Sequence, residues 1–251
     1  MTYFHTRDAT VNANAFPTHM HNEYEMLFFI EGNADYMIES SVYTLERYDL
    51  LFIKPRTYHN LLPRSSAPYE RFVINFTDEE AVSVPEGIGC IFNAAGNAFI
   101  RGSFEEWARL EARGRYNELE IFVKSVIRPL LTVAANTEQD ERSARASRDD
   151  RLKNVLDHID SHPAENITLG QISDKFYLSP SWLAHMFKKR MGISLMQYAS
   201  RKRMLYAEQL IKAGTPPTTA AEICGFDNYS TFYRQYKKAL GISPRAAFHE
   251  R

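Results

Sequence analysis

Residues 168–190 read TLGQISDKFYLSPSWLAHMFKKR. Apolar residues recur at helical spacing on both sides of a short break, and helix N-caps are expected at Thr168, Ser179 and Ser194. Pro180 then takes the first helical position, where its missing N–H costs nothing. Two short helices joined by a tight turn form a helix-turn-helix, whose second helix can enter the major groove of DNA.

The same plan recurs in residues 219–240, which read TAAEICGFDNYSTFYRQYKKAL. Gly225 is expected at the turn with a positive φ, and Phe232, Tyr236 and Leu240 are expected to face inward. Residues 195–212 predict one helix between the two units. A helix of that length spans roughly 27 Å, comparable with the ~34 Å between successive major-groove faces of B-DNA. The two units could therefore meet adjacent groove segments from one side.

The formal net charge of −1 hides an asymmetry along the chain. Residues 151–251 contain 15 Lys and Arg against 8 Asp and Glu, whereas residues 1–150 contain 15 against 23. Such a split indicates that the C-terminal part meets a polyanion and that the N-terminal part does not.

Residues of about 152–248 resemble the DNA-binding domain of the AraC/XylS family of transcription regulators. The matching stretches are LSPSWL (178–183), MFKKRMG (186–192), Tyr198 with Arg203, AEQL (207–210), AEICGFD (221–227) and FYRQYKKALGISP (232–244). The last stretch is the most specific. The sequence departs from the family at 246–248, where an aromatic residue and an arginine more often follow the proline.

The resemblance implies which side chains contact DNA. Base contacts are expected from Ser181, Ala184 and His185 in the first helix-turn-helix and from Tyr229, Thr231 and Arg234 in the second, with Trp182 and Ser230 beside them. Arg234 is the strongest candidate, because a guanidinium can pair bidentately with guanine. Phosphates are expected to meet Lys188, Lys189, Lys237 and Lys238. The alternative is a bundle of ordinary amphipathic helices with a solvated basic face.

The N-terminal part shows a different pattern. Runs rich in Phe, Tyr, Ile and Val predict strands at 24–31, 34–39, 50–53 and 71–76, which indicates a β-barrel or sandwich. From Ser103 to about residue 135 the period becomes helical, and Pro129 is expected to kink the second helix or end it early. Residues 138–150 have no large apolar side chain and predict a linker. Domains are therefore expected at 1–137 and 151–251.

The string HMHNEYEMLFFIEG at residues 19–32 carries the residues with chemistry. In a strand, His19, His21 and Glu25 share a face, and His59 follows a later turn. Three imidazoles and one carboxylate could hold a divalent ion. The spacing resembles the cupin pattern, which implies a cupin-like barrel with a helical pair and an α+β chain. Tyr48 and Arg56 replace glycines of the second cupin motif, so the sequence leaves the orientation of the His59 side chain open.

Three alternatives stay open for this polar group: a metal site, a set of effector contacts, or histidines satisfied within the core. An effector pocket would use His19, His21, Glu25, Tyr36, Arg56 and His59. Its mixed aromatic and polar walls would suit a sugar or another hydroxylated metabolite. By analogy with the family, the segment Tyr3–His5 is expected to fold over the pocket.

These observations predict a ligand-responsive, sequence-specific DNA-binding transcription regulator that is not an enzyme. Expected partners are double-stranded DNA, a small-molecule effector, a second copy of the chain and RNA polymerase. The residues leave activation and repression open, although an activator is expected. The apolar face of Leu119, Phe122, Val126, Ile127 and Leu130 either packs on the barrel or mediates self-association.

A cytoplasmic protein is expected, with no membrane partner and no disulfide. The longest uninterrupted apolar run is Met26–Ile30, and the two cysteines lie far apart in the sequence. No cofactor is expected apart from the possible divalent metal. Two alternatives remain: a metal-dependent cupin enzyme with an appended helical domain, and a constitutive DNA-binding protein whose barrel only dimerises.

Overall fold

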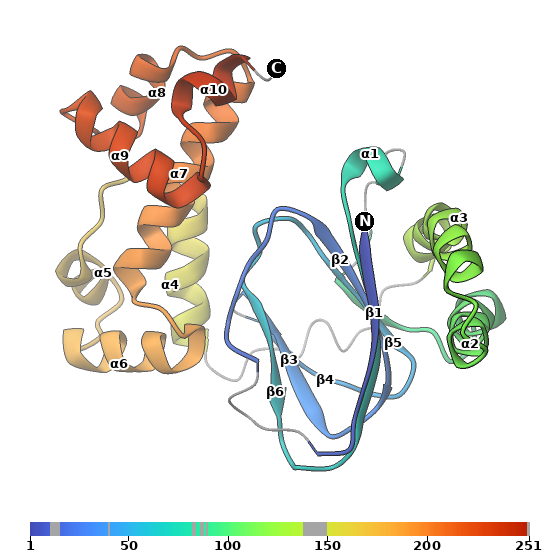
Figure 1. Ribbon diagram of the computed structural model, residues 1–251. Coiled ribbons are helices and arrows are strands. Elements are labelled where there is room, and N and C mark those ends of the chain that lie inside the picture. The colour runs from blue at the N-terminus through green and yellow to red at the C-terminus, as the bar shows by residue number, and fades with distance from the viewer. Residues whose placement is uncertain are drawn as a thin grey trace. The chain divides into compact units, whose positions relative to one another are not determined.

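The computed structural model describes residues 1–10, 16–39, 41–81, 84–85, 88, 90–137 and 150–249. The chain divides into two compact units, Met1–Arg148 and Asp149–Arg251, which are described separately (Figure 1). The predicted linker lies outside the described residues except for Asp150. Among the described helices, none is both long and apolar enough to cross a membrane.

The first unit contains two antiparallel sheets. Its strands are β1 (Thr2–Asp8), β2 (Tyr24–Glu31), β3 (Ala34–Ile38), β4 (Ser41–Thr44), β5 (Asp49–Ile53), β6 (His59–Pro63), β7 (Tyr69–Phe76) and β8 (Ile91–Asn93). One sheet has the order β1-β7-β2-β5-β8 and the other has the order β4-β3-β6. The predicted 24–31 strand is confirmed at both ends, and the other three predicted strands differ by one or two residues.

Both faces of the five-stranded sheet are buried. Met26 and Phe28 face one side with α2 (Ala98–Ala112) and α3 (Tyr116–Ala135), whereas Leu27 and Phe29 face the three-stranded sheet. Figure 1 shows the two helices beside this sheet. Because every side chain of the strand centre is buried, β2 has a continuous apolar run instead of an alternating one. The predicted α+β architecture is confirmed.

The helical pair packs against its own sheet. Leu119, Ile127 and Leu130 are buried in one cluster with the sheet side chains, so this apolar face is covered within the chain. The expectation that Pro129 ends α3 early is wrong, because the helix continues to Ala135. A short helix, α1 (Asp78–Ala81), follows β7.

In the described residues of the second unit, all regular secondary structure is helical. Its helices are α4 (Asp150–Ser161), α5 (Leu169–Lys175), α6 (Pro180–Met191), α7 (Leu195–Lys212), α8 (Pro217–Ile223), α9 (Tyr229–Leu240) and α10 (Pro244–His249). Side chains cap α5, α6 and α7 at Thr168, Ser179 and Ser194, as predicted. The predicted connector helix is α7, with the same ends.

The second helices of the two helix-turn-helix units end alike. α6 ends at Gly192 and α9 at Gly241, both with left-handed backbone at φ of 71° and 80°. An Ile-Ser pair follows each glycine, and the serine side chains cap the next helices. The turns before the second helices also match, since Gly225 has the predicted positive φ of 69° and Tyr177 has a φ of 54°. The two helix-turn-helix motifs, α5–α6 and α8–α9, are therefore a structural repeat.

Candidate functional site

α6 presents its predicted base-contacting residues near its N-terminal end. Ser181 and His185 are exposed, and Ala184 is half-buried. Trp182 is half-buried because Arg151 of α4 lies over its ring, with Cζ 4.4 Å from the ring centroid. Trp182 therefore takes part in packing within the unit, which leaves the smaller side chains and His185 as the outward row.

α9 presents a longer polar row. Tyr229, Ser230 and Arg234 are exposed and Thr231 is half-buried, while Phe232 and Tyr236 on the opposite side are fully buried. Among the described residues no carboxylate pairs with Arg234, so its guanidinium is available to a ligand. Leu240, predicted to face inward, is only partly buried at the end of the helix.

Four exposed lysines continue these two rows. Lys188 and Lys189 lie in the last turn of α6, and Lys237 and Lys238 lie in the last turn of α9. A positive charge at a helix C-terminus also stabilises the helix dipole, by about 0.3–1 kcal/mol at an exposed site. These lysines therefore serve the helices whether or not phosphates bind them.

Side chains of α7 hold both helix-turn-helix units. Arg203 Nη1 donates to Asn166 Oδ1, 2.8 Å away and just before α5, and its guanidinium lies 4.3 Å from the centroid of Phe226 in the second turn. Arg201 donates to the carbonyl of Ala239 near the end of α9. In the sequence, Arg203 stands out only as part of the family resemblance. A charged residue inside an apolar helical stripe was the signal for this positioning role.

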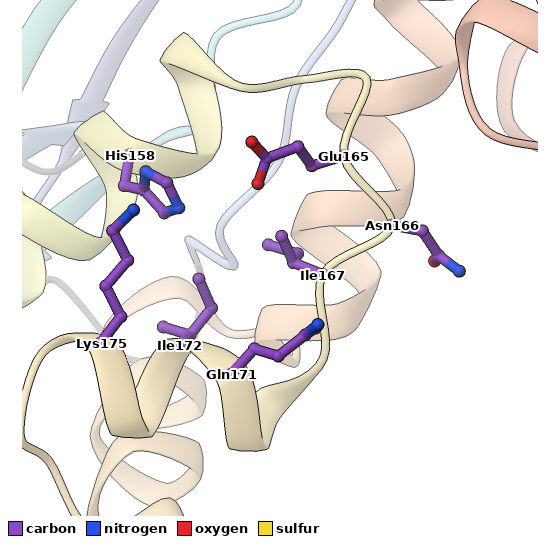
Figure 2. Close-up of a pocket in the computed structure, with 7 residues that line it drawn as sticks. All are labelled: His158, Glu165, Asn166, Ile167, Gln171, Ile172 and Lys175. Atoms are coloured by element: carbon purple, nitrogen blue, oxygen red, sulfur yellow. The ribbon is translucent and has the colours of Figure 1, made fainter.

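One cavity of the helical unit lies away from α6 and α9. It has a volume of about 320 Å³, and Figure 2 shows His158 and Lys175 on one side and Glu165 directed into it. Asn166 points away from this cavity. None of the predicted DNA-contacting side chains lines it.

The structure brings His19, His21, Glu25 and His59 together in the first unit. One donor atom from each residue lies within 4.8 Å of the others. The expectation that His19 and His21 belong to one strand with Glu25 is wrong, because β2 begins only at Tyr24. His19 is positioned instead by an isolated bridge, in which it exchanges backbone hydrogen bonds of 3.1 and 3.0 Å with His59.

Each of the three imidazoles makes a hydrogen bond from Nδ1 to a backbone carbonyl oxygen. The acceptors are Pro17 O at 3.0 Å for His19, Glu23 O at 3.0 Å for His21 and Thr57 O at 2.8 Å for His59. A carbonyl oxygen can only accept, so each Nδ1 carries the proton and each Nε2 is left for the cluster.

Glu25 is the acid of this cluster and is buried between the two sheets. Its Oε1 accepts a hydrogen bond of 2.9 Å from Tyr36, and its Oε2 lies 3.2 Å from His21 Nε2 and 3.6 Å from His59 Nε2. Burial would raise the pKa of Glu25, but these partners together lower it below its usual range. The same contact with Glu25 outweighs burial and raises the pKa of His21, while burial and His59 lower that of His19.

The missing cupin glycines do not prevent this arrangement. Tyr48 and Arg56 adopt the left-handed backbone that a glycine would favour, with φ of 71° and 64°. The backbone N–H of Arg56 donates to His21 O at 2.7 Å, which joins the turn before His59 to the His21 loop. Arg56 itself is half-buried and its Nε donates to Asn22, so it lies beside the cluster and outside it.

The N-terminal segment does not cover this cluster. Tyr3 and His5 lie in β1, an edge strand paired with β7, and they pack on Trp107 and Phe72 at the helix-covered face. The expectation that the segment folds over the pocket is therefore wrong.

A second polar site was missed from the sequence. A cavity of about 500 Å³ is lined by residues that include Arg7, Arg47 and Glu70. Glu70 accepts from Arg7 at 2.8 Å and is contacted by His5 at 2.9 Å. These residues come from separate strands and a turn, and no local motif joins them.

Two family models match the chain. The model described as AraC-like ligand binding domain matches residues 3–156, and a model described as Helix-turn-helix domain matches residues 172–250. The first match contains the histidine cluster and the second contains α6 and α9.

Known proteins are similar to the chain over different lengths. The protein named "Probable transcriptional regulator LumQ" from Photobacterium leiognathi is 35% identical over 98 residues, which are 38% of this chain and 40% of that protein. The HTH-type transcriptional activator RhaS from Pectobacterium carotovorum is 22% identical over 94% of this chain and 88% of that protein. The solved C-terminal domain of AraT, a response regulator from Geobacillus stearothermophilus, is 29% identical over 42% of this chain and 89% of that chain, with a TM-score of 0.40.

Proposed function

Since the chain belongs to the AraC family of transcription regulators, with a ligand-binding domain and a helix-turn-helix domain, we propose that α6 and α9 read two adjacent major-groove segments of DNA. The observation that carries this proposal is the repeat itself. Both helices start at a side-chain cap and end at a left-handed glycine. Both also contact α7, α6 through Phe187 against Tyr198 and α9 through the hydrogen bond from Arg201. The protein is a ligand-responsive transcription regulator.

The two helices divide the work of recognition. Arg234 supplies the strongest base contact, with Tyr229, Ser230 and Thr231 beside it. Ser181, Ala184 and His185 of α6 contribute a smaller polar surface, to which Trp182 adds only its exposed edge. The four lysines at the helix ends contact phosphates and fix the position of the protein on the duplex.

The effector site of this proposal is the group His19, His21, Glu25, Tyr36, Arg56 and His59. Its support is that Glu25, Tyr36 and His59 are buried polar groups from the two sheets and that His19 and His21 converge with Glu25 and His59, while Arg56 lies beside them. The cavity lined by Arg7, Arg47 and Glu70 is a second candidate, because it has room for a metabolite and charges of both signs.

The chain acts as a homodimer in this proposal and meets RNA polymerase at the promoter as an activator, without catalytic activity of its own. A dimer would use a surface other than the α3 face, which is buried against the sheet. The exposed side chains of Tyr116 and Ile121 on α3 offer one such surface. Because its partner is DNA and the relatives are bacterial, the proposed location is the cytoplasm.

Selection of binding sites from random duplexes tests this function. We expect enrichment of a sequence with two short conserved blocks about 10 base pairs apart. A competitor duplex with the blocks scrambled should bind at least about a thousandfold more weakly. Equal binding to selected and scrambled duplexes would contradict sequence-specific regulation.

A further inference from the structure

We propose that the N-terminal unit binds one divalent transition-metal ion through Nε2 of His19, His21 and His59 and the carboxylate of Glu25. The inference deepens the proposed function, because it assigns an occupant to the effector site and rests on that site being a ligand site. Metal binding itself requires no DNA.

The four donor groups already converge. The donor atoms lie within 4.8 Å of one another, and in a tetrahedral site with bonds of about 2.1 Å they would lie about 3.4 Å apart. Side-chain shifts of about 1 Å close that difference. His19 is exposed and precedes β2, so its ring can move without disturbing a strand.

The outer contacts of the ligands are those of a metal site. Nδ1 of each imidazole donates to a backbone carbonyl, so in the neutral imidazole the Nε2 lone pair is directed toward the centre. His21 Nε2 contacts Glu25 in the metal-free chain, and a metal ion would replace the proton of that hydrogen bond. Tyr36 donates to the far oxygen of Glu25 and holds the carboxylate in place. Metal-ligating histidines and carboxylates almost always have such partners.

His59 gives a second, independent observation. Its side chain is 1% exposed, and Nε2 has no hydrogen-bond partner among the described residues. The nearest charged atom that the structure records for it is Oε2 of Glu25, 3.6 Å away, which is too far for a hydrogen bond. A buried nitrogen without a hydrogen bond is uncommon in folded proteins, and a metal ion between Nε2 and this carboxylate would satisfy both groups.

The donor set selects the class of ion. Imidazole nitrogen with one carboxylate suits zinc, nickel, cobalt, iron or copper, whereas magnesium and calcium require mainly oxygen ligands. Three nitrogens and one oxygen complete a tetrahedral site, and an effector oxygen or water would bind only by expanding the coordination to five.

The chain offers an internal control. In the C-terminal unit, His158 lies in α4 and His162 directly follows that helix, and their ring centroids are 4.4 Å apart. Among the described residues this pair does not belong to a group of three or more ligands that could hold a metal ion, so it should attract metal only weakly. His162→Gln removes this pair, and His19→Gln removes an exposed ligand of the proposed site by the same chemical change.

The test uses the full chain freed of metal with EDTA and then titrated with Co²⁺ and Zn²⁺ at pH 7.5. We expect one ion per chain after gel filtration, a Co²⁺ absorption spectrum of nitrogen–oxygen coordination, and displacement of cobalt by zinc. Affinity should fall at least about tenfold for His19→Gln and about a hundredfold for Glu25→Gln, with no change for His162→Gln. Circular dichroism and thermal melting establish that each variant folds.

Three results would overturn the inference: no ion retained, equal affinity in wild type and His19→Gln, or loss of binding in His162→Gln alone. The last two would mean an adventitious ion only. Binding of the metal-free chain to a selected duplex is measured in parallel. Failure to bind metal with intact DNA binding removes this inference alone, whereas metal binding without any DNA binding supports it and contradicts the proposed function.

Discussion

Arg234 is the side chain on which base selection depends most. It is exposed near the middle of α9, and a bidentate contact with guanine contributes about 1–3 kcal/mol of discrimination. Arg234→Ala should therefore weaken binding to the selected duplex by about 1–3 kcal/mol and relax the preference at one position. Fluorescence anisotropy with duplexes changed one base pair at a time measures both. Arg128→Ala, which removes an exposed arginine of α3, is the matched control and should leave affinity unchanged.

His21 gives the metal-free protein a pH-dependent contribution to stability. The pKa of His21 is raised by its hydrogen bond to Glu25, against the opposing effect of burial. A histidine whose pKa is higher in the folded than in the unfolded chain stabilises the folded state. This stabilisation is complete at pH values below the pKa of the unfolded chain, about 6.5, and is lost as pH rises through the pKa of the folded chain. The melting temperatures of wild type and His21→Gln in EDTA should differ more at pH 6 than at pH 9.

The charged neighbours of His21 provide the check on that interpretation. Glu23, Glu25, His19 and His59 surround it, and Glu25 is the first cause of its shift. In a Glu25→Gln background the effect of His21→Gln should lose its pH dependence. A difference that stays constant from pH 6 to pH 9 in wild type would contradict the assigned pair.

For the histidine cluster, the sequence predicted which residues take part and not what brings them together. His19, His21, Glu25 and His59 were identified from spacing, yet a backbone bridge brings them together and a shared strand does not. Sequence also left His59 open, because Tyr48 and Arg56 replace glycines. Backbone hydrogen bonds to distant segments accompany both positive φ values, since Tyr48 N donates to Phe29 O and Arg56 N donates to His21 O, and residue type alone does not reveal such contacts.

The turns of the helix-turn-helix units belong to the scale of elements. Gly225 has a φ of 69°, and a Cβ there would meet only Ala164 O at 3.7 Å, so strain rather than a clash decides the cost. Gly225→Ala should lower the free energy of unfolding by about 1–2 kcal/mol. Gly170→Ala, in α5 with no neighbour within 4 Å, should raise it by about 0.4–1 kcal/mol. Urea titration followed by circular dichroism measures both, and equal effects would contradict the assigned backbone.

Elements with strong local signals were predicted well. α7 was placed at both ends because a capping serine, a long helical period and a following Ala-Gly mark it. Strands β4, β6 and β8 have three to five residues and no alternating pattern, so nothing local distinguishes them from loop. Pro129 does not end α3 because it removes only one backbone hydrogen-bond donor, and the apolar face of the helix stays buried against the sheet.

Two units of opposite charge make up the whole molecule, and the basic one should function alone. Residues 150–251 contain all the helices that the proposal assigns to DNA. The fragment should fold and bind a selected duplex more weakly than the full chain. Four lysine–phosphate contacts predict a slope of log affinity against log salt of about −3 to −4. Affinity that does not depend on salt would contradict the assigned phosphate contacts.

The charge split and the linker composition predict a division of the chain at residues 138–150, because each depends on residue type alone. The cavity around Arg7, Arg47 and Glu70 was not predicted, because it exists only after β1, β7 and the turn before β5 meet. Sites assembled from distant segments follow from the topology of the sheet and leave no motif in the sequence.

If α6 and α9 enter successive major grooves on one side of a duplex, both grooves must be shielded at once. Dimethyl sulfate protection of guanine N7, with the full chain on a selected duplex, measures this. We expect two protected major-groove patches whose centres lie about 10 base pairs apart, with the patch at α9 lost in Arg234→Ala, if this mode of binding is right. A single protected patch, or protection unchanged in that variant, would contradict it.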